Sequence, residues 1–185
     1  MTEELLKDAG ERMHKAVEVM RREFSGLRAG RATPALLERV RVDYYGVPTP
    51  INQLATIMVP EPRLLVIQPW DKAVIAAVER AILKSDLGIT PNSDGQLVRL
   101  VIPRLTAERR AELTKLVRRQ AEETRVSVRN VRRELIDDLR SLEKDSEITE
   151  DDFHRAQEQA QKITDEAIAS VDAVLAEKEK ELAEV

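Results

Sequence analysis

Residues 105–143, LTAERRAELTKLVRRQAEETRVSVRNVRRELIDDLRSLE, are the stretch that decides the fold. Apolar side chains recur there three and four positions apart, which places them on one face of an α-helix. This stripe consists of Leu113, Val117, Ala121, Thr124, Val128, Val131, Leu135, Leu139 and Leu142. At 1.5 Å per residue the helix would reach roughly 50–60 Å. It therefore needs other long helices to cover its apolar face.

Two further segments have the same kind of stripe. In residues 2–27 it comprises Leu6, Ala9, Met13, Val17, Met20, Phe24 and Leu27. In the C-terminal segment it comprises Ala156, Ala160, Ile163, Ala167, Val171, Val174 and Leu182. Thr149 is the expected N-cap of this last helix, with Asp152 completing a capping box and Ile148 packing on Phe153. Because the stripes are rich in Ala and depart from strict heptads, they favour a three-helix bundle within one chain over a coiled-coil dimer.

The middle of the chain, residues 30–104, has a different character. Seven of the eight prolines lie between Pro34 and Pro91, and Pro103 closes the segment. Short β-like runs occur at residues 40–45, 57–59, 64–68 and 97–102. A short helix is expected over 72–83 with Asp71 as its N-cap, a turn at 91–95, and Trp70 packed inside the module.

The predicted fold class is therefore α+β. Residues 1–29 and 105–185 form an elongated three-helix bundle, and residues 30–104 form a small β/α/β domain inserted into it. The chain has no cysteine, so disulfides and zinc–thiolate sites are excluded. The acidic N-terminus lacks the layout of a signal peptide, and no apolar run is long enough to cross a bilayer. We expect a cytoplasmic, monomeric protein.

Charge is segregated along the chain although the net charge is only −4. Residues 104–133 hold ten Arg or Lys against four Glu, whereas residues 141–185 hold five against fourteen Asp or Glu. On a helical wheel six arginines of residues 105–143 fall together on one flank: Arg118, Arg125, Arg129, Arg132, Arg133 and Arg140. Four acidic residues of the same stretch lie mostly on the opposite flank: Glu112, Glu123, Glu134 and Asp137. This sorting indicates a partner with dense negative charge, although a solvated helix with scattered ion pairs stays an alternative.

Nucleic acid is the partner that this flank favours. Guanidinium groups bind phosphates in a bidentate manner, and five aromatic residues are too few for platforms on which bases stack. Such a surface recognises backbone shape, so folded RNA is favoured over a specific DNA site. The two histidines, His14 and His154, lie in different helices without a nucleophile pattern nearby. We expect no enzymatic activity, no cofactor and no metal.

Several stretches together resemble the ribosome recycling factor family over the full length. They are LRAGRATP (27–34), VDYYGVPTPINQLA (42–55), SDLGITPNS (85–93), LTAERR (105–110) and VRNVRR (128–133). Ala107 stands where the family often has Glu. The resemblance implies an L-shaped protein with flexible hinges between its two domains. It also implies joint action with elongation factor G and GTP, which splits the post-termination ribosome and releases mRNA and tRNA.

The family pattern also assigns residues. Arg28, Arg129 and Arg132 would face large-subunit ribosomal RNA. With the other arginines of the flank, the predicted RNA-binding set is Arg28, Arg110, Arg118, Arg125, Arg129, Arg132 and Arg133. The expected hinge consists of Gly30, Arg31, Arg104 and Leu105, and the small domain would meet the translocase. Two other functions stay open: a coiled-coil adaptor for an acidic protein and, more distantly, an RNA-processing enzyme.

Overall fold

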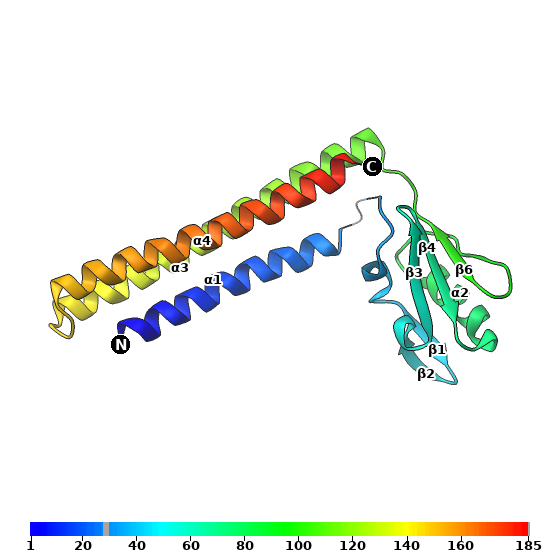
Figure 1. Cartoon of the computed structure of the whole chain (residues 1–185), viewed down its shortest axis with the longest axis horizontal. Helices are drawn as coiled ribbons and strands as arrows, with labels where there is room; N and C mark the ends of the chain where they lie inside the picture. Colours follow the sequence, from blue (N-terminus) through cyan, green and yellow to red (C-terminus); the bar gives the residue numbers. More distant parts are fainter. Residues whose placement is uncertain (28–29, 185) are drawn as a thin grey trace. The chain divides into compact units, whose positions relative to one another are not determined.

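The computed structural model describes residues 1–27 and 30–184. The chain forms two compact units, one made of Met1–Phe24 and Glu108–Glu184, the other of Ser25–Ala107. The first unit is helical and the second holds the strands (Figure 1). An α+β fold with a long helical bundle and a small sheet is thus confirmed.

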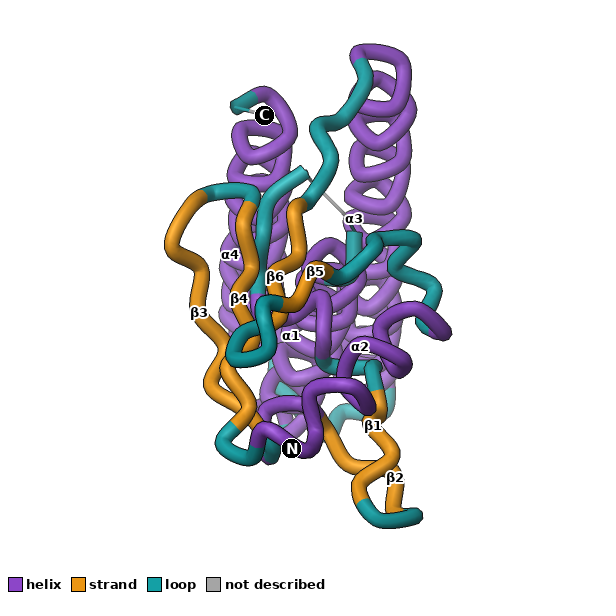
Figure 2. Tube along the Cα trace, turned by 90° about the vertical axis from the view of Figure 1, so that its right-hand side faces the viewer, coloured by secondary structure: helices purple, strands orange, loops and turns teal. Residues whose placement is uncertain are grey.

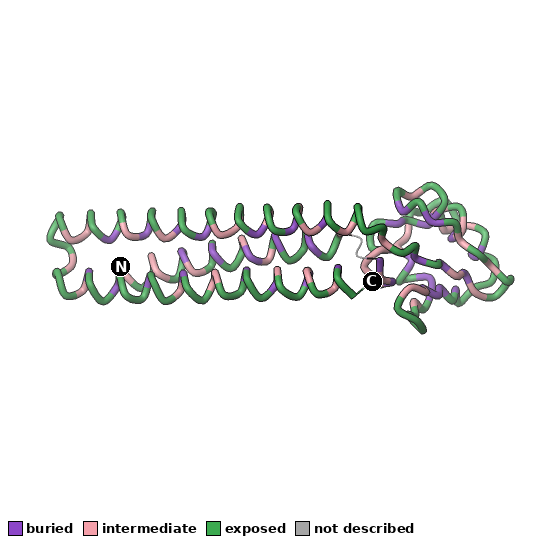
Figure 3. The backbone as a smooth tube through the Cα atoms, turned by 90° about the horizontal axis from the view of Figure 1, so that it is seen from above, coloured by how far each residue is buried: buried purple, intermediate pink, exposed green. Residues whose placement is uncertain are grey.

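Three long helices make the first unit: α1 (Thr2–Ser25), α3 (Ala107–Lys144) and α4 (Glu150–Ala183). They lie side by side, with their buried residues facing one another (Figure 3). One cluster of buried side chains joins all three and consists of Ala9, Met13, Val128, Val131, Leu135, Leu139, Phe153, Ala156 and Ala160. Each large apolar side chain buried in this way contributes about 1.5–3 kcal/mol. The predicted stripes are therefore the core of the bundle.

A tight connection between α3 and α4 makes these helices antiparallel. Thr149 is the N-cap: its hydroxyl accepts a hydrogen bond from the amide of Asp152 at 3.1 Å. The Asp152 carboxylate accepts one from the Thr149 amide at 3.2 Å, so the predicted capping box is present. Ile148 packs against the cluster that contains Phe153, as expected for a hydrophobic staple.

The second unit contains a four-stranded antiparallel sheet in the order β3-β4-β6-β5 (Figure 2). Its strands are β3 (Ala55–Glu61), β4 (Leu64–Pro69), β6 (Val98–Val101) and β5 (Asn92–Ser93). Helix α2 (Ile75–Lys84) packs on one face, where its residues Val78 and Ile82 share a buried cluster with Leu65, Ile67 and Val98. Asp71 accepts a hydrogen bond from the amide of Ala73 at 2.9 Å, so it caps the turn before α2 as predicted.

A separate hairpin joins β1 (Arg41–Tyr44) to β2 (Val47–Pro50). Sequence patterns indicate β1 but not β2, because Pro48 and Pro50 remove two backbone donors. Those prolines fit here because β2 is an edge strand. Strand β5 has only two residues, too few for any periodic signal.

Trp70 does not pack inside the sheet unit, and the expectation that it does is wrong. Its side chain is 68% exposed, and its indole N–H donates to the hydroxyl of Thr56 at 3.1 Å. Asp71 begins the next helical turn directly after it, so the chain leaves the sheet at this point.

Candidate nucleic-acid interface

A row of arginines follows one side of α3. Arg118, Arg125 and Arg132 recur every seven residues, which is close to two helical turns, so they lie nearly in line. Helix α4 runs antiparallel beside this row. Its side chains therefore determine how much positive charge the row presents to a partner.

Two members of the row are paired with carboxylates of α4. The guanidinium of Arg118 donates to Glu179 at 2.6 Å. That of Arg125 donates twice to Asp172, from Nε at 2.9 Å and from Nη2 at 2.6 Å. Both carboxylates come from the acidic C-terminal segment, which the fold brings alongside the basic one.

Glu122 adds a third carboxylate on the same flank. It accepts hydrogen bonds from Arg125 at 3.1 Å and from Arg129 at 3.2 Å. The bond to Arg129 is the first cause, and that to Arg125 the second, of a lowered pKa of Glu122. The pKa of Arg125 is raised, chiefly by its hydrogen bonds to Asp172. Arg118, Arg125 and Arg129 are therefore paired with carboxylates, and two of these carboxylates come from α4, which a charge pattern within α3 alone does not include.

Arg132 has a different environment. Its Nη1 donates to the amide oxygen of Gln161 at 2.7 Å, and the amide nitrogen of Gln161 donates to Asp165 at 2.8 Å. No ion pair within 4.0 Å joins Arg132 to a carboxylate among the described residues. Its Nε is buried and has no hydrogen-bond partner there. Arg132 is therefore oriented by a neutral amide rather than neutralised by a carboxylate.

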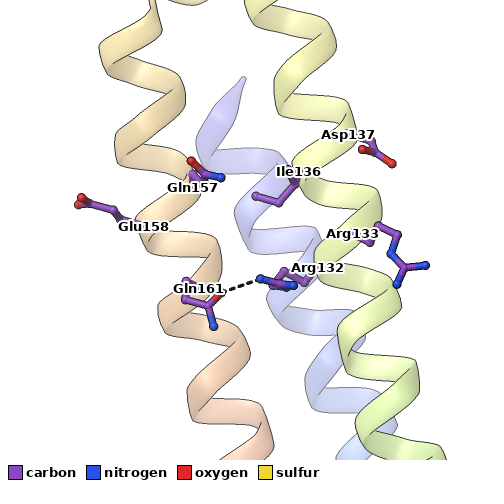
Figure 4. A pocket seen from close by; sticks show the side chains of 7 residues that line it. All are labelled: Arg132, Arg133, Ile136, Asp137, Gln157, Glu158 and Gln161. Carbon is purple, nitrogen blue, oxygen red and sulfur yellow. Dashed lines mark hydrogen bonds between the residues drawn. The ribbon is translucent and has the colours of Figure 1, made fainter.

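A groove of about 480 Å³ lies at this place between α3 and α4. Figure 4 shows Arg132, Ile136, Gln157 and Gln161 in the space between the two helices. The acidic groups of Asp137 and Glu158, which also line the groove, point away from that space (Figure 4). The groove therefore has a guanidinium at its centre, beside the aliphatic side chain of Ile136 and two amides.

The remaining predicted arginines differ in position. Arg133 is exposed beside the groove, and within residues 1–27 and 30–184 it forms no ion pair. Arg110 is half-buried near the start of α3. Arg28 lies outside the described residues, so the structure says nothing about it. The structure thus brings Arg129, Arg132 and Arg133 together on α3.

Comparisons with known proteins decide the family. A family model described as ribosome recycling factor matches residues 20–182. The chain belongs to the ribosome recycling factor family. The ribosome-recycling factor of Geobacillus thermodenitrificans is 58% identical over 185 residues, covering all of both chains. That of Carboxydothermus hydrogenoformans is 57% identical over 182 residues, 98% of each chain.

Solved structures of the family have the same fold. A solution structure of the ribosome recycling factor has a TM-score of 0.80 and 43% identity, over 100% of this chain and 98% of that one. A second structure contains models for the T. thermophilus ribosome recycling factor and the E. coli elongation factor G bound to the E. coli post-termination complex. It has a TM-score of 0.68 and 46% identity, covering 98% of each chain.

In this family member, hydrogen bonds anchor the chain on both sides of the sheet unit. The amide of Ala32 donates to the carbonyl of Pro62 at 2.7 Å, and that of Ile102 to the carbonyl of Arg63 at 2.8 Å. Both acceptors lie in the turn between β3 and β4. Residues 103–106 then run without regular structure to α3. The predicted hinge residues Arg104 and Leu105 lie in that segment.

The other two predicted hinge residues precede the Ala32 anchor. Gly30 has a φ of +72° and is buried, a conformation that favours glycine. Arg31 is half-buried. The residues that the structure describes contain no group of three or more His, Cys, Asp or Glu side chains placed to hold a metal ion. They also contain no helix long and apolar enough to span a membrane.

Sequence reasoning missed Gln161, Asp165, Asp172 and Glu179, the α4 residues that act on the arginine row. One signal could have found them. Thr149 marks a tight turn, so residues equally far from that turn on the two helices must face each other. Arg125 follows Arg118 by seven residues, and Asp172 precedes Glu179 by seven residues, as facing pairs on antiparallel helices do.

Proposed function

We propose that this chain recycles ribosomes. It binds the post-termination ribosome through large-subunit ribosomal RNA and, with elongation factor G and GTP, splits it into subunits, so that mRNA and tRNA are released. Membership of the family supports the general function. The solved structure of a related factor together with elongation factor G on a post-termination complex supports the choice of partner. The translocase supplies GTP hydrolysis, and this chain acts in the cytoplasm as a non-catalytic factor.

The observation that carries the RNA-binding part is the groove with Arg132. A guanidinium that is held in place by an amide and has no carboxylate partner among the described residues is suited to a backbone phosphate. Arg133 adds a second exposed cation at the rim. Aromatic side chains are absent from the groove lining, so contact with phosphates rather than stacking on bases is the chemistry available.

Not all predicted arginines fit this role equally. Arg118, Arg125 and Arg129 have carboxylate partners at 2.6–3.2 Å, and a phosphate would have to compete with those partners. Arg118 and Arg129 are still 65% and 48% exposed, so each can rotate toward RNA. Arg125 is only 19% exposed. We therefore assign the main contacts to Arg132 and Arg133, secondary ones to Arg118 and Arg129, and a structural role to Arg125.

We further propose that the two units move relative to each other at Gly30–Arg31 and Arg104–Leu105, with domain boundaries at 29/30 and 104/105. Supporting this, both segments lie outside the anchors at Ala32 and Ile102. Buried side chains from all three helices pack in one cluster, which supports a bundle that moves as one body. A force from the translocase on the sheet unit would then be converted into movement at these two segments while the bundle stays bound to RNA.

Sedimentation with bacterial ribosomes tests the proposal. The wild-type chain should pellet with ribosomes and, with elongation factor G and GTP, convert them into subunits. Arg132→Glu should reduce both activities at least tenfold, because it removes a charged hydrogen bond and places a like charge near phosphate. The fold should be unchanged, as the side chain is at the edge of the core.

Arg119→Glu is the matched control. It makes the same charge change on the same helix, but at 100° per residue Arg119 lies about 140° around the helix from Arg132. Its side chain is 71% exposed. If both variants weakened binding equally, only overall charge would matter and the groove assignment would be wrong. Normal binding and splitting by Arg132→Glu would also contradict it.

A further inference from the structure

The pairing between α3 and α4 follows a regular register. Arg118 faces Glu179, and Arg125, seven residues later, faces Asp172, seven residues earlier. Antiparallel helices with this spacing place the next pair at Arg132 and Asp165. The register therefore predicts a third ion pair of the same kind.

That third ion pair is absent, because Gln161 stands between its two members. The amide oxygen of Gln161 accepts from Arg132 at 2.7 Å, and its amide nitrogen donates to Asp165 at 2.8 Å (Figure 4 shows the first of these bonds). The orientation of the amide is fixed by chemistry, since a guanidinium only donates and a carboxylate only accepts. Gln161 thus forms hydrogen bonds with the Arg132 guanidinium and the Asp165 carboxylate at the same time.

We propose that Gln161 is a positioning residue that keeps Arg132 available to an RNA phosphate by engaging Asp165 in its place. This inference rests on the proposed function, in which Arg132 contacts ribosomal RNA. The ligand is a single backbone phosphate, and Gln161 acts on it only through Arg132.

The physical reason is the difference between an amide and a carboxylate as partner. A carboxylate would hold the guanidinium equally well but would cancel its charge, as Asp172 and Glu122 do for Arg125. A cancelled charge contributes little to counterion release, which dominates affinity for nucleic acids. An amide oxygen orients the guanidinium without adding charge. Holding it in advance also reduces the entropy lost when RNA binds.

The structure also leaves room for the phosphate. Arg132 lines the groove of about 480 Å³ between α3 and α4, and its guanidinium lies in the space between the two helices (Figure 4). Its Nε is buried, so a phosphate would approach the Nη side of the guanidinium. The carboxylates of Asp137 and Glu158 point away from the centre of the groove (Figure 4).

Removal of the Gln161 amide tests the inference. In Gln161→Ala, Asp165 loses its partner and is expected to pair with Arg132. Ribosome binding by the full chain should weaken about tenfold, the size expected for loss of one charge-assisted hydrogen bond. The slope of log affinity against log salt should fall by about 0.7–0.9, corresponding to one phosphate contact.

A double-mutant cycle separates this effect from simple packing. Asp165→Asn alone should change binding little, because Gln161 already keeps Asp165 from Arg132. In the Gln161→Ala background the same change should restore most of the affinity and the salt slope. Gln159→Ala, which trims an exposed amide on α4 that does not line the groove, should leave both quantities unchanged.

Two other outcomes would overturn the inference. One is a Gln161→Ala variant that binds and responds to salt like the wild type. The other is an Asp165→Asn gain that is equal in both backgrounds, since that would indicate general electrostatics. Arg132→Ala distinguishes failure of the proposed function from failure of this inference. If Arg132→Ala binds ribosomes normally, the proposed RNA contact of Arg132 is wrong. If it binds weakly while Gln161→Ala binds normally, only the role of Gln161 is wrong.

Discussion

Arg125 and Arg132 carry the same type of side chain and lie seven residues apart on one helix. Their neighbours nevertheless suit one to joining two helices and the other to binding a ligand. Arg125 is 19% exposed and has two carboxylate partners, so it joins α3 to α4. Arg132 has an amide partner instead of a carboxylate and lines the groove, so its charge can serve a new ligand. The identity of the neighbour on α4, rather than the arginine, decides the difference.

Arg125→Met should therefore affect stability rather than RNA binding. Methionine keeps the apolar stem but removes the guanidinium, at a cost of about 1 kcal/mol in the free energy of unfolding. This value lies below the range for charged hydrogen bonds, because Asp172 and Glu122 are 54% and 56% exposed and water screens the interaction. Denaturant unfolding measures this loss, and the salt slope of ribosome binding should not change. An unchanged unfolding free energy with a smaller salt slope would show that Arg125 contacts RNA.

At the scale of the elements, the start of α4 sets the register on which the arginine row depends. The capping box of Thr149 and Asp152 fixes where the helix begins. The side-chain and backbone hydrogen bonds from Thr149 are the main causes of the lowered pKa of Asp152. A lowered pKa contributes stability that is present above the ordinary value of 3.8 and is lost as the pH falls through the lowered one.

Thr149→Ala should destabilise the chain by about 1 kcal/mol at neutral pH, the usual cost of losing an N-cap. It should also raise the pKa of Asp152 toward its ordinary value, so the unfolding midpoint of the variant should depend less on pH below pH 3.8. Thermal unfolding across an acid pH series measures both effects. Thr114→Ala is a suitable control, because that hydroxyl only bonds back to the Arg110 carbonyl within α3. Equal losses in the two variants would contradict a special role for the cap.

Long helices were the part of the fold most open to prediction. Stripes such as Val117, Val128 and Leu139 repeat over many turns, so one uncertain position does not hide the period. Short strands lack that redundancy, which is why β2 and β5 have no usable signal. Trp70 shows a different limit: apolar character predicts burial, but the chain leaves the sheet at that residue and exposes it.

The sequence likewise predicts the part of the candidate site that lies on α3 but not the part that lies on α4. Arg132 and Arg133 follow from helical periodicity and the family resemblance. Gln161 and Asp165 do not, because their role depends on which turn of α4 faces which turn of α3. A local charge pattern likewise describes one helix alone and omits carboxylates that another segment supplies, as Asp172 and Glu179 do.

At the scale of the whole molecule, folding pairs part of the basic segment with the acidic one. The acidic segment 141–185 packs against the basic segment 104–133 and neutralises part of it. Arg132 and Arg133, which line the groove, form no ion pair among the described residues. A chain with a net charge of −4 can therefore present a local positive site to RNA.

The most direct test of this account is a structure, by electron cryo-microscopy, of the chain bound to a bacterial post-termination ribosome. We predict that the guanidinium of Arg132 lies within hydrogen-bond distance of a phosphate oxygen of large-subunit RNA, with Gln161 still between Arg132 and Asp165. A bound chain whose α3–α4 groove faces solvent or protein, while other surfaces of the bundle contact the RNA, would contradict it.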